Sequence, residues 1–524
     1  MGETIRAGHS RPQPDKVARR WTVVRALAAS LALLVLLSGC SGGPASDDGA
    51  GPTATGAPTA PDGTVATALD LAPGCGLDRL AVVHHADGRL AAASGPVPVG
   101  CLVHTGVDSA EPTIGIASDG TVFHYPAAVI DRDLPDTPAV RFLTGVSVSY
   151  NEGEDWRVLL PTAGPTAPTH QVSLDPYFYL DPETDRIWAD DLFSPNCSVL
   201  SISDDLGQTW TNTAGGCTET DHQTIFAGPP VSSTTIGYPN ILYRCSINYV
   251  ALDGSSTAST CTKSLDGGLT SVPTGEPLYV TRAEDLPDVC SGAVGHGTAG
   301  PDGTIYVPKG TCNEAMLFIS HDEGATWDGV QVSDIDMAAG EHDAGVGVDA
   351  AGNVYYFWIG LDRLPYLAVS RDGGLSWGEP FMVGPPGLKE AHLPAAQAAG
   401  EGKVAFAYFG SFDAPGVGSD DGEYAETTWH QMVGMTVDAL ADDPLFYTAS
   451  TSPADDPIAV GPCNTVRCNN AVKDFIHLEV GPDGTPWVAS VDGCSTACAA
   501  SGSFDNDIRE GAVARLWGGP SLLD

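Results

Sequence analysis

One short pattern recurs along the chain and restricts its fold more than any other feature. The pattern Ser-x-Asp-x-Gly-x-x-Trp reads SDDLGQTW at 203–210, SHDEGATW at 320–327 and SRDGGLSW at 370–377. Two weaker copies are SYNEGEDW at 149–156, which has Asn for Asp, and SLDGGLTS at 264–271, which lacks the Trp. The starting serines are 54, 61, 56 and 50 residues apart, so the chain is built from repeats of near-regular length.

The residue types in this pattern predict a tight turn with a buried plug. Gly supplies a backbone conformation with positive φ, and Asp accepts hydrogen bonds from nearby backbone amides. The Trp ring is expected to pack beneath the turn while its N–H finds an acceptor. We expect a structural role for the pattern residues of the three full copies, which are Ser203, Asp205, Gly207, Trp210, Ser320, Asp322, Gly324, Trp327, Ser370, Asp372, Gly374 and Trp377.

A second motif precedes most copies by some twenty to thirty-five residues. It places Asp-Gly or Gly-Asn between two alternating apolar runs, which is a strong β-hairpin signal. The copies are ASDGTVFHY at 117–125, GPDGTIYV at 300–307, DAAGNVYYFW at 349–358 and GPDGTPWVAS at 481–490, with a weaker one at 395–408. Because the last hairpin has no turn pattern after it, the chain holds more repeats than turn patterns.

The repeated pattern resembles the Asp-box, or BNR, repeat of sialidases and other β-propellers. This resemblance implies an all-β propeller of four-stranded antiparallel blades. The box would join the third and fourth strands of a blade, and the hairpin motif the first and second. Counting inner strands gives seven blades, with six as the alternative, near residues 111–165, 175–216, 221–275, 295–332, 342–385, 391–450 and 475–516. The N-terminal stretch 77–85 is expected to supply the fourth strand of the last blade and so to close the ring.

The N-terminus reads as an export signal. Arginines precede the apolar run 26–36, which is short for a membrane span, and Leu-Ser-Gly-Cys follows at 37–40. This ending resembles the bacterial lipobox, which implies cleavage before Cys40 and a lipid on its sulfur. We therefore predict a signal peptide at 1–39, a flexible Gly/Pro/Ala/Thr linker at 40–71 and the propeller at 72–524. The mature protein would be anchored to the outer face of the cell membrane.

The charge of the mature chain limits its partners. Removing residues 1–39 takes away six basic and two acidic residues, which leaves 18 Lys and Arg against 64 Asp and Glu, a net charge of −46. Nucleic acids and anionic lipid headgroups are therefore excluded as expected partners, whereas cations are attracted.

The cysteine count indicates an oxidising compartment. Twelve cysteines remain besides Cys40, and an even number in an exported chain favours disulfides over zinc ligation. Sequence does not fix the connectivity. Pairing neighbours gives Cys75 with Cys101, Cys197 with Cys217, Cys245 with Cys261, Cys290 with Cys312, Cys463 with Cys468, and Cys494 with Cys498.

Candidate site residues follow from the propeller resemblance. Inner strands would begin on the same face that carries the connections between second and third strands, opposite the boxes; we call it the loop-rich face. The residues near the starts of five inner strands include one histidine each, namely His222, His296, His342, His392 and His477. Two of these histidines, His296 and His342, could bind a divalent cation, calcium or zinc, together with the carboxylate of Asp343. The alternative is that each imidazole only satisfies backbone groups at a strand end.

The sequence favours ligand binding over a defined chemistry. Arg244 and Arg363 are further ligand-binding candidates, but the Phe/Tyr-Arg-Ile-Pro motif usual in sialidases is absent, so we assign no catalytic residue. No nucleotide fingerprint or nucleophile elbow is present either. We expect a surface protein that binds an extracellular glycan or protein on the loop-rich face. The alternative is a glycoside hydrolase of sialidase-like fold with a diverged site at the channel mouth.

Overall fold

Short β-strands separated by turns make up nearly all of the described chain. The computed structural model describes residues 71–126, 129–130, 142–161, 173, 176–192, 198–216, 220–249, 257–281, 293–338, 344–464, 467–468, 472–473, 475–494 and 509–523. Residues Gly63–Asp524 form one compact unit. Within the described ranges, no helix is long and apolar enough to cross a membrane.

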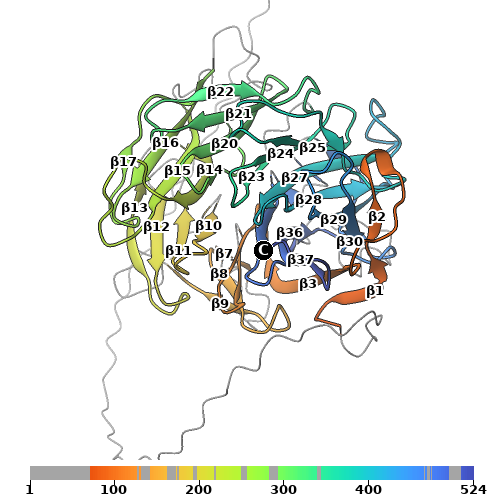
Figure 1. Cartoon of the computed structure of the whole chain (residues 1–524). Helices are drawn as coiled ribbons and strands as arrows, with labels where there is room; N and C mark the ends of the chain where they lie inside the picture. The colour runs from red at the N-terminus through yellow and green to blue at the C-terminus, as the bar shows by residue number, and fades with distance from the viewer. Residues whose placement is uncertain are drawn as a thin grey trace, which may run out of the picture. The chain divides into compact units, whose positions relative to one another are not determined.

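Seven antiparallel sheets follow one another along the chain, which confirms the seven-bladed count (Figure 1). Blade 1 contains β4 (Thr113–Ile116), β5 (Val122–Tyr125), β8 (Val146–Ser149) and β9 (Arg157–Leu159). Blade 2 contains β10 (Tyr177–Leu180), β11 (Ile187–Asp191), β12 (Ser198–Ser203) and β13 (Thr211–Gly216). Blade 3 contains β14 (Thr220–Gly228), β15 (Ile241–Tyr249), β16 (Thr257–Ser264), β17 (Val272–Pro273) and β18 (Tyr279–Val280).

The remaining blades repeat this order. Blade 4 contains β19 (Thr298–Ala299), β20 (Ile305–Thr311), β21 (Glu314–Ser320) and β22 (Asp328–Gln331). Blade 5 contains β23 (Gly345–Val348), β24 (Val354–Ile359), β25 (Pro365–Ser370) and β26 (Phe381–Met382). Blade 6 contains β27 (Glu390–Ala398), β28 (Val404–Ser411), β29 (Thr428–Thr436) and β30 (Phe446–Ser450), and blade 7 contains β35 (His477–Val480), β36 (Pro486–Asp492) and β37 (Glu510–Trp517).

Short pieces lie beside these blades. They are the 3-10 turn η1 (Ala86–Gly88) and strands β6 (Val129–Ile130), β7 (Phe142–Leu143), β31 (Ala459–Val460), β32 (Cys463–Asn464), β33 (Arg467–Cys468) and β34 (Val472–Lys473). The first strand of each blade contacts the first strand of the next, in the cyclic order β4, β10, β14, β19, β23, β27, β35 and back to β4. These seven inner strands therefore surround the central channel.

The N-terminal segment closes the ring, but with a different strand than expected. The fourth strand of blade 7 is β3 (Val99–Asp108), which pairs with β37. The predicted stretch 77–85 instead divides between two blades. Its first part belongs to β1 (Cys75–Leu80), which adds a fifth strand to blade 7 by pairing with β3, and its second part forms β2 (Val82–His84), which pairs with β30 in blade 6. Closure by the N-terminal segment is thus confirmed, whereas the assignment of 77–85 as the fourth strand of blade 7 was wrong. The outer edges of blades 6 and 7 each accept part of that stretch, which sequence patterns near 77–85 do not reveal.

The predicted turns lie where the repeat pattern placed them. In the hairpin between β19 and β20, Gly303 has a φ of 85°, a conformation that favours glycine. Each box follows a third strand. Ser203 Oγ donates to Asp205 Oδ1 over 2.9 Å and accepts from the Gly207 amide over 2.8 Å, and Trp210 Nε1 donates to the Gly207 carbonyl over 2.9 Å. The structural role predicted for the boxes is consistent with these internal hydrogen bonds.

The hydrophobic core lies between neighbouring blades rather than at one centre. Blades 1 and 2 bury Phe123 against Phe178, and the ring of Trp210 packs on the same cluster, so a box also joins its blade to the preceding one. Blades 5 and 6 approach so closely that a Cβ on Gly345 would lie 2.3 Å from the Ala396 amide nitrogen, which explains glycine at that position.

Two of the expected disulfides are present as predicted, Cys75 with Cys101 and Cys245 with Cys261. The first joins β1 to β3, and the second joins β15 to β16. Cys312, Cys463 and Cys494 are also disulfide-bonded. Cys197, Cys217, Cys290 and Cys498, as well as the side chain of Cys468, lie outside the described residues, so the remaining pairings stay predictions.

Candidate functional site

Aromatic and imidazole rings meet in the middle of the central channel. His296 and His477 lie with ring centroids 4.7 Å apart, and Tyr177 lies 5.5 Å from His296 and 5.9 Å from His477. Phe475 touches His296 at 5.0 Å and His222 at 6.2 Å. We call these five side chains, contributed by blades 2, 3, 4 and 7, the ring plug. Three histidines that the sequence predicted to converge are thus brought together through Phe475.

Hydrogen bonds orient the rings of the plug. The Tyr177 hydroxyl lies 2.8 Å from His296 Nδ1, and the Ile114 amide donates to His477 Nδ1 over 3.1 Å. Because His477 Nδ1 accepts, a neutral ring carries its proton on Nε2, which lies 3.8 Å from Glu479 Oε1. The plug is therefore a positioned set of donors and acceptors as well as an apolar contact.

Burial keeps the imidazoles of His296 and His477 neutral. It lowers the pKa of His477 to about 4, although the hydrogen bond from the Ile114 amide opposes the shift. It also lowers the pKa of His296 well below its ordinary value, and the nearby His477 and His222 lower it further. At neutral pH these rings are therefore uncharged, because desolvation by burial is the largest effect on the pKa of each.

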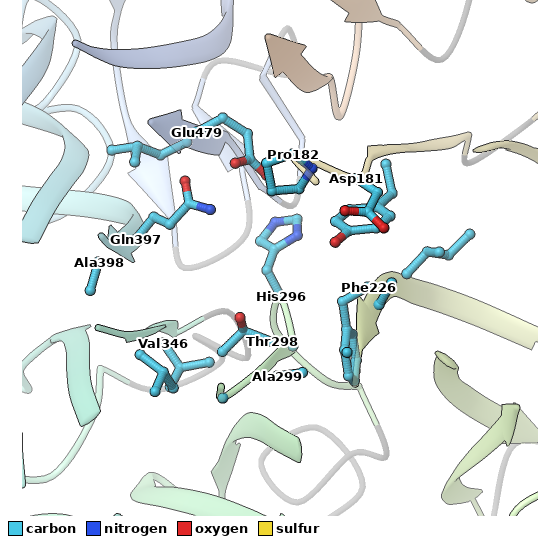
Figure 2. Close-up of a pocket in the computed structure, with 18 of the residues that line it drawn as sticks. Asp181, Pro182, Phe226, His296, Thr298, Ala299, Val346, Gln397, Ala398 and Glu479 are labelled. Carbon is cyan, nitrogen blue, oxygen red and sulfur yellow. The ribbon is translucent and has the colours of Figure 1, made fainter. Parts of the chain in front are cut away.

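A cavity of about 260 Å³ extends from the ring plug toward the face opposite the loop-rich one. We call this the box face, because it carries the Asp-boxes. Its lining runs from Tyr177, His296 and His477 to the first hairpins of blades 2 and 4 at Pro182 and Pro301. Figure 2 shows Thr298, Gln397 and Glu479 around the space beside His296. The sequence gives no sign of this cavity, because its lining comes largely from the second halves of inner strands, which carry no distinctive motif.

The carboxyl groups of the cavity have different environments. Burial raises the pKa of Glu479 to about 8, although a hydrogen bond from Gln397 opposes the shift. Burial also raises the pKa of Asp181, whose oxygens accept from the Glu183 amide over 2.9 Å and from Asn240 Nδ2 over 3.1 Å. Asn240 Nδ2 also donates to Glu183 Oε2 over 3.0 Å. The carboxyl groups of Asp181 and Glu183 thus accept hydrogen bonds within the protein. Glu479 faces the cavity with 18% of its side chain exposed.

The fourth described candidate histidine belongs to a separate cluster on the loop-rich face. His392 is buried, stacks edge-on against Trp429 at 5.0 Å, and places Nδ1 3.3 Å from Arg363 Nη1. Burial lowers the pKa of His392, and the positive charge of Arg363 lowers it further. Nearby, the Tyr424 hydroxyl donates to Glu390 Oε1 over 2.7 Å. We call Arg363, Glu390, His392 and Tyr424 the rim cluster.

Backbone irregularities accompany two of the candidate histidines. The register between β14 and β15 shifts just after Asp221, and His222 has a φ of 47°. Likewise, the register between β27 and β28 shifts after His392, and Leu393 has a φ of 55°. Non-glycine residues in this conformation are uncommon, and bulges often redirect side chains at binding sites. Neither bulge has a recognisable signal in the sequence.

Arg244 lies away from the channel. Its Nε donates to Asp190 Oδ2 over 2.7 Å and its Nη2 to Ser198 Oγ over 2.9 Å, so it forms a buried ion pair between blades 2 and 3. His342, Asp343 and the lipidation site Cys40 lie outside the described residues, so the cation site and the anchor stay predictions. Among the residues that the structure describes, no three His, Cys, Asp or Glu side chains form a group able to hold a metal ion.

Comparisons with known proteins find similar solved structures but no related sequence. No family model and no curated protein matches the sequence. A protein of unknown function from Dyadobacter fermentans is similar over 81% of this chain and 99% of its own, with 12% identity and a TM-score of 0.38. The intramolecular trans-sialidase from Ruminococcus gnavus is similar over 78% of this chain and 95% of its own, with 13% identity and a TM-score of 0.33.

A third similar structure is the Trypanosoma rangeli sialidase. It shares 13% identity over 67% of this chain and 56% of its own, with a TM-score of 0.37. Identities and scores in this range assign no activity to the present chain. The function of this chain must therefore be argued from its own residues.

Proposed function

We propose that this chain is a lipid-anchored surface propeller that binds an extracellular ligand, a glycan or a protein, on its loop-rich face. The observation that carries the proposal is the character of this face on blades 5 and 6. Leu361, Phe412 and Val417 are large apolar side chains exposed by 52%, 40% and 60% on the connections β24–β25 and β28–β29. The same connections carry Arg363 and Tyr424 of the rim cluster. Exposed apolar groups beside hydrogen-bonding groups are typical of binding surfaces.

The position of Arg244 supports binding rather than sialoside cleavage. Sialidases hold the sugar carboxylate with three arginines, whereas Arg244 is here committed to Asp190 and Ser198. The alternative, a glycoside hydrolase with a diverged site, has one specific observation in its favour. The hydrogen bond between Tyr424 and Glu390 beside Arg363 resembles the Tyr–Glu pair of sialidases.

The binding proposal is tested with surface variants. The domain 72–524 is applied to a defined glycan array and to intact producing cells with a chemical crosslinker. Combined replacement of Leu361, Phe412 and Val417 by Ala is expected to abolish the binding seen with the wild type. Leu375→Ala is the matched control, because Leu375 is exposed by 60% within a box on the opposite face. Equal binding by both variants contradicts the proposal.

The alternative is tested with fluorogenic glycosides that include a sialoside. Turnover by the wild type that Tyr424→Phe abolishes would replace the binding proposal with the hydrolase.

The anchor is tested separately by Cys40→Ser. In detergent phase partitioning, the wild type is expected in the detergent phase and this variant in the aqueous phase, because the lipidated sulfur is lost. Retention of the variant in membranes would contradict lipidation at Cys40.

A further inference from the structure

The central cavity has the chemistry of a binding site separate from the loop-rich face. The ring plug separates the cavity from the loop-rich face, since Tyr177, His296 and His477 line the inner end of the cavity. A volume of about 260 Å³ suits a ligand of a few heavy atoms rather than a polymer. A ligand would reach it from the box face, where the hairpins of blades 2 and 4 form the outer lining.

The charges that line the cavity select the sign of its ligand. Asp181, Glu183 and Glu479 contribute carboxyl groups, and the lining contains neither lysine nor arginine. The mature chain carries a strong negative charge in addition. An anionic ligand would therefore be repelled at every approach, whereas a cation would be attracted.

Glu479 is the group that lacks a partner of opposite charge. Its nearest basic neighbour is His477, 3.8 Å away, which is neutral because of its burial. Among the described residues no lysine or arginine pairs with Glu479. An enclosed carboxyl without a cation is unfavourable in its charged form, so a cationic ligand would stabilise it.

The rest of the lining indicates which kind of cation fits. Tyr179 and Phe226 add aromatic rings to the wall, and rings of this kind attract organic ammonium groups. A metal ion is disfavoured, because the described side chains provide no group of three metal ligands. Thr298 and Gln397 complete the wall with polar groups for a substituent of the ligand.

We propose that the central cavity binds a small organic cation, an alkylammonium or quaternary ammonium compound, with its charge against the Glu479 carboxylate and its carbon substituents against Tyr179 and Phe226. This inference does not rest on the function proposed for the loop-rich face. Surface variants on blades 5 and 6 are expected to leave it unchanged.

Binding of such a cation is coupled to a proton. The groups that face Glu479 are His477 on its own strand, His296 from blade 4, Tyr179, Asp181 and Glu183 from blade 2, and Gln397 from blade 6. Since the pKa of Glu479 is raised to about 8, this carboxyl is largely protonated in the empty cavity at neutral pH. A bound cation favours the ionised form, so binding releases a proton below pH 8, and affinity rises with pH until about 8.

The experiment is calorimetric titration of the unit 63–524 with tetramethylammonium chloride and butylammonium chloride, with glucose and sodium acetate as neutral and anionic probes. Runs in buffers of different ionisation enthalpy measure the protons released. Glu479→Gln removes the charge and keeps the shape, and it is expected to weaken cation binding at least tenfold and to abolish proton release. Glu401→Gln, at an exposed hairpin position, is the matched control and is expected to bind like the wild type.

Each outcome decides the proposal. Saturable binding of either ammonium probe that is lost in Glu479→Gln and kept in Glu401→Gln supports it. It is overturned by equal binding in both variants, by preference for glucose or acetate, or by a wild-type dissociation constant above about 10 mM for both ammonium probes. Circular dichroism of each variant separates lost binding from lost folding.

Discussion

At the residue scale, histidines near the starts of different inner strands have different surroundings. His296 and His477 meet in the ring plug, whereas His392 is separated from them and lies against Trp429 and Arg363. All three are neutral because they are buried, so none resembles an exposed histidine that titrates near neutral pH. Neighbours from other blades, not local sequence, decide what each imidazole does.

Lys309 offers a prediction at this scale, because it is fully buried on β20. Its Nζ donates to the Ala293 carbonyl over 2.8 Å and lies 4.8 Å from the centroid of the Tyr279 ring. Burial lowers the pKa of Lys309 to about 7, so between that pH and the ordinary value of 10.5 the unfolded chain binds more protons than the folded one. Stability is therefore expected to rise with pH over this window.

Lys309→Met tests this expectation. The variant keeps the aliphatic volume and removes the titration, so its stability relative to the wild type should be highest near pH 7 and should fall by several kcal/mol toward about pH 10. Guanidinium unfolding at several pH values measures the difference. Lys389→Met, at an exposed position, is the control and should show no such trend. Parallel pH curves for wild type and Lys309→Met would refute the buried ammonium.

At the element scale, the box is defined by its hydroxyl–carboxylate pair more than by its Trp. The copy beginning at Ser264 lacks the Trp but keeps the bond from Ser264 Oγ to Asp266 Oδ1, at 2.8 Å. Between β29 and β30, Thr436 Oγ1 donates to Asp438 Oδ1 over 2.8 Å, and that carboxylate accepts from the Leu445 amide over 3.0 Å. Blade 6 therefore contains a degenerate box that the sequence pattern did not reveal.

Asp372 allows the contribution of one box to be measured. Its carboxylate accepts from the Ser376 hydroxyl and amide and from Ser370, which together lower its pKa. Asp372→Ala is expected to destabilise the fold by about 1 kcal/mol, and Asp372→Asn by less, because Asn keeps one acceptor oxygen. Since the carboxylate pKa is lowered on folding, this stabilisation should be present at neutral pH and disappear as pH falls through the acid range. Thermal unfolding of both variants measures the order of their stabilities. An Ala variant as stable as the wild type would show that the carboxylate does not stabilise the fold.

At the scale of the whole molecule, the N-terminal segment binds two blades together. Strand β2 completes blade 6, while β1 and β3 complete blade 7, and the disulfide between Cys75 and Cys101 ties β1 to β3. Closure by β3 covers the outer edge of β37, which would otherwise present unpaired backbone groups. Ring closure therefore depends on β3 more than on the strands before it.

Two truncations test this division of roles. A chain that begins at residue 97 and carries Cys101→Ser keeps β3, and it is expected to remain monomeric and to unfold cooperatively at a lower temperature than the wild type. A chain that begins at residue 111 lacks β3, and it is expected to aggregate or to lose cooperative unfolding. Size-exclusion chromatography and thermal scans compare them. A stable monomer from the shorter chain would show that blade 7 does not need its fourth strand.

The sequence alone determined the all-β propeller and the position of the turns, and it favoured seven blades over six. It could do so because box and hairpin signals are local: a Ser, an Asp and a Gly within a few residues suffice to make the turn that holds Ser203, Asp205 and Gly207. The sequence favoured disulfides between neighbouring cysteines but left the connectivity open, and the structure shows Cys75 paired with Cys101 and Cys245 with Cys261.

Only the tertiary structure decided which strand closes the ring, which histidines meet and what surrounds the central cavity. Val99–Asp108 and 77–85 are both short extended segments, and only the free edges of blades 6 and 7 select between them. Likewise, nothing near Glu479 in the sequence shows that Gln397, His296 and Asp181 share its cavity. Such contacts join residues far apart in the chain, and their geometry depends on how closely seven blades pack around one axis.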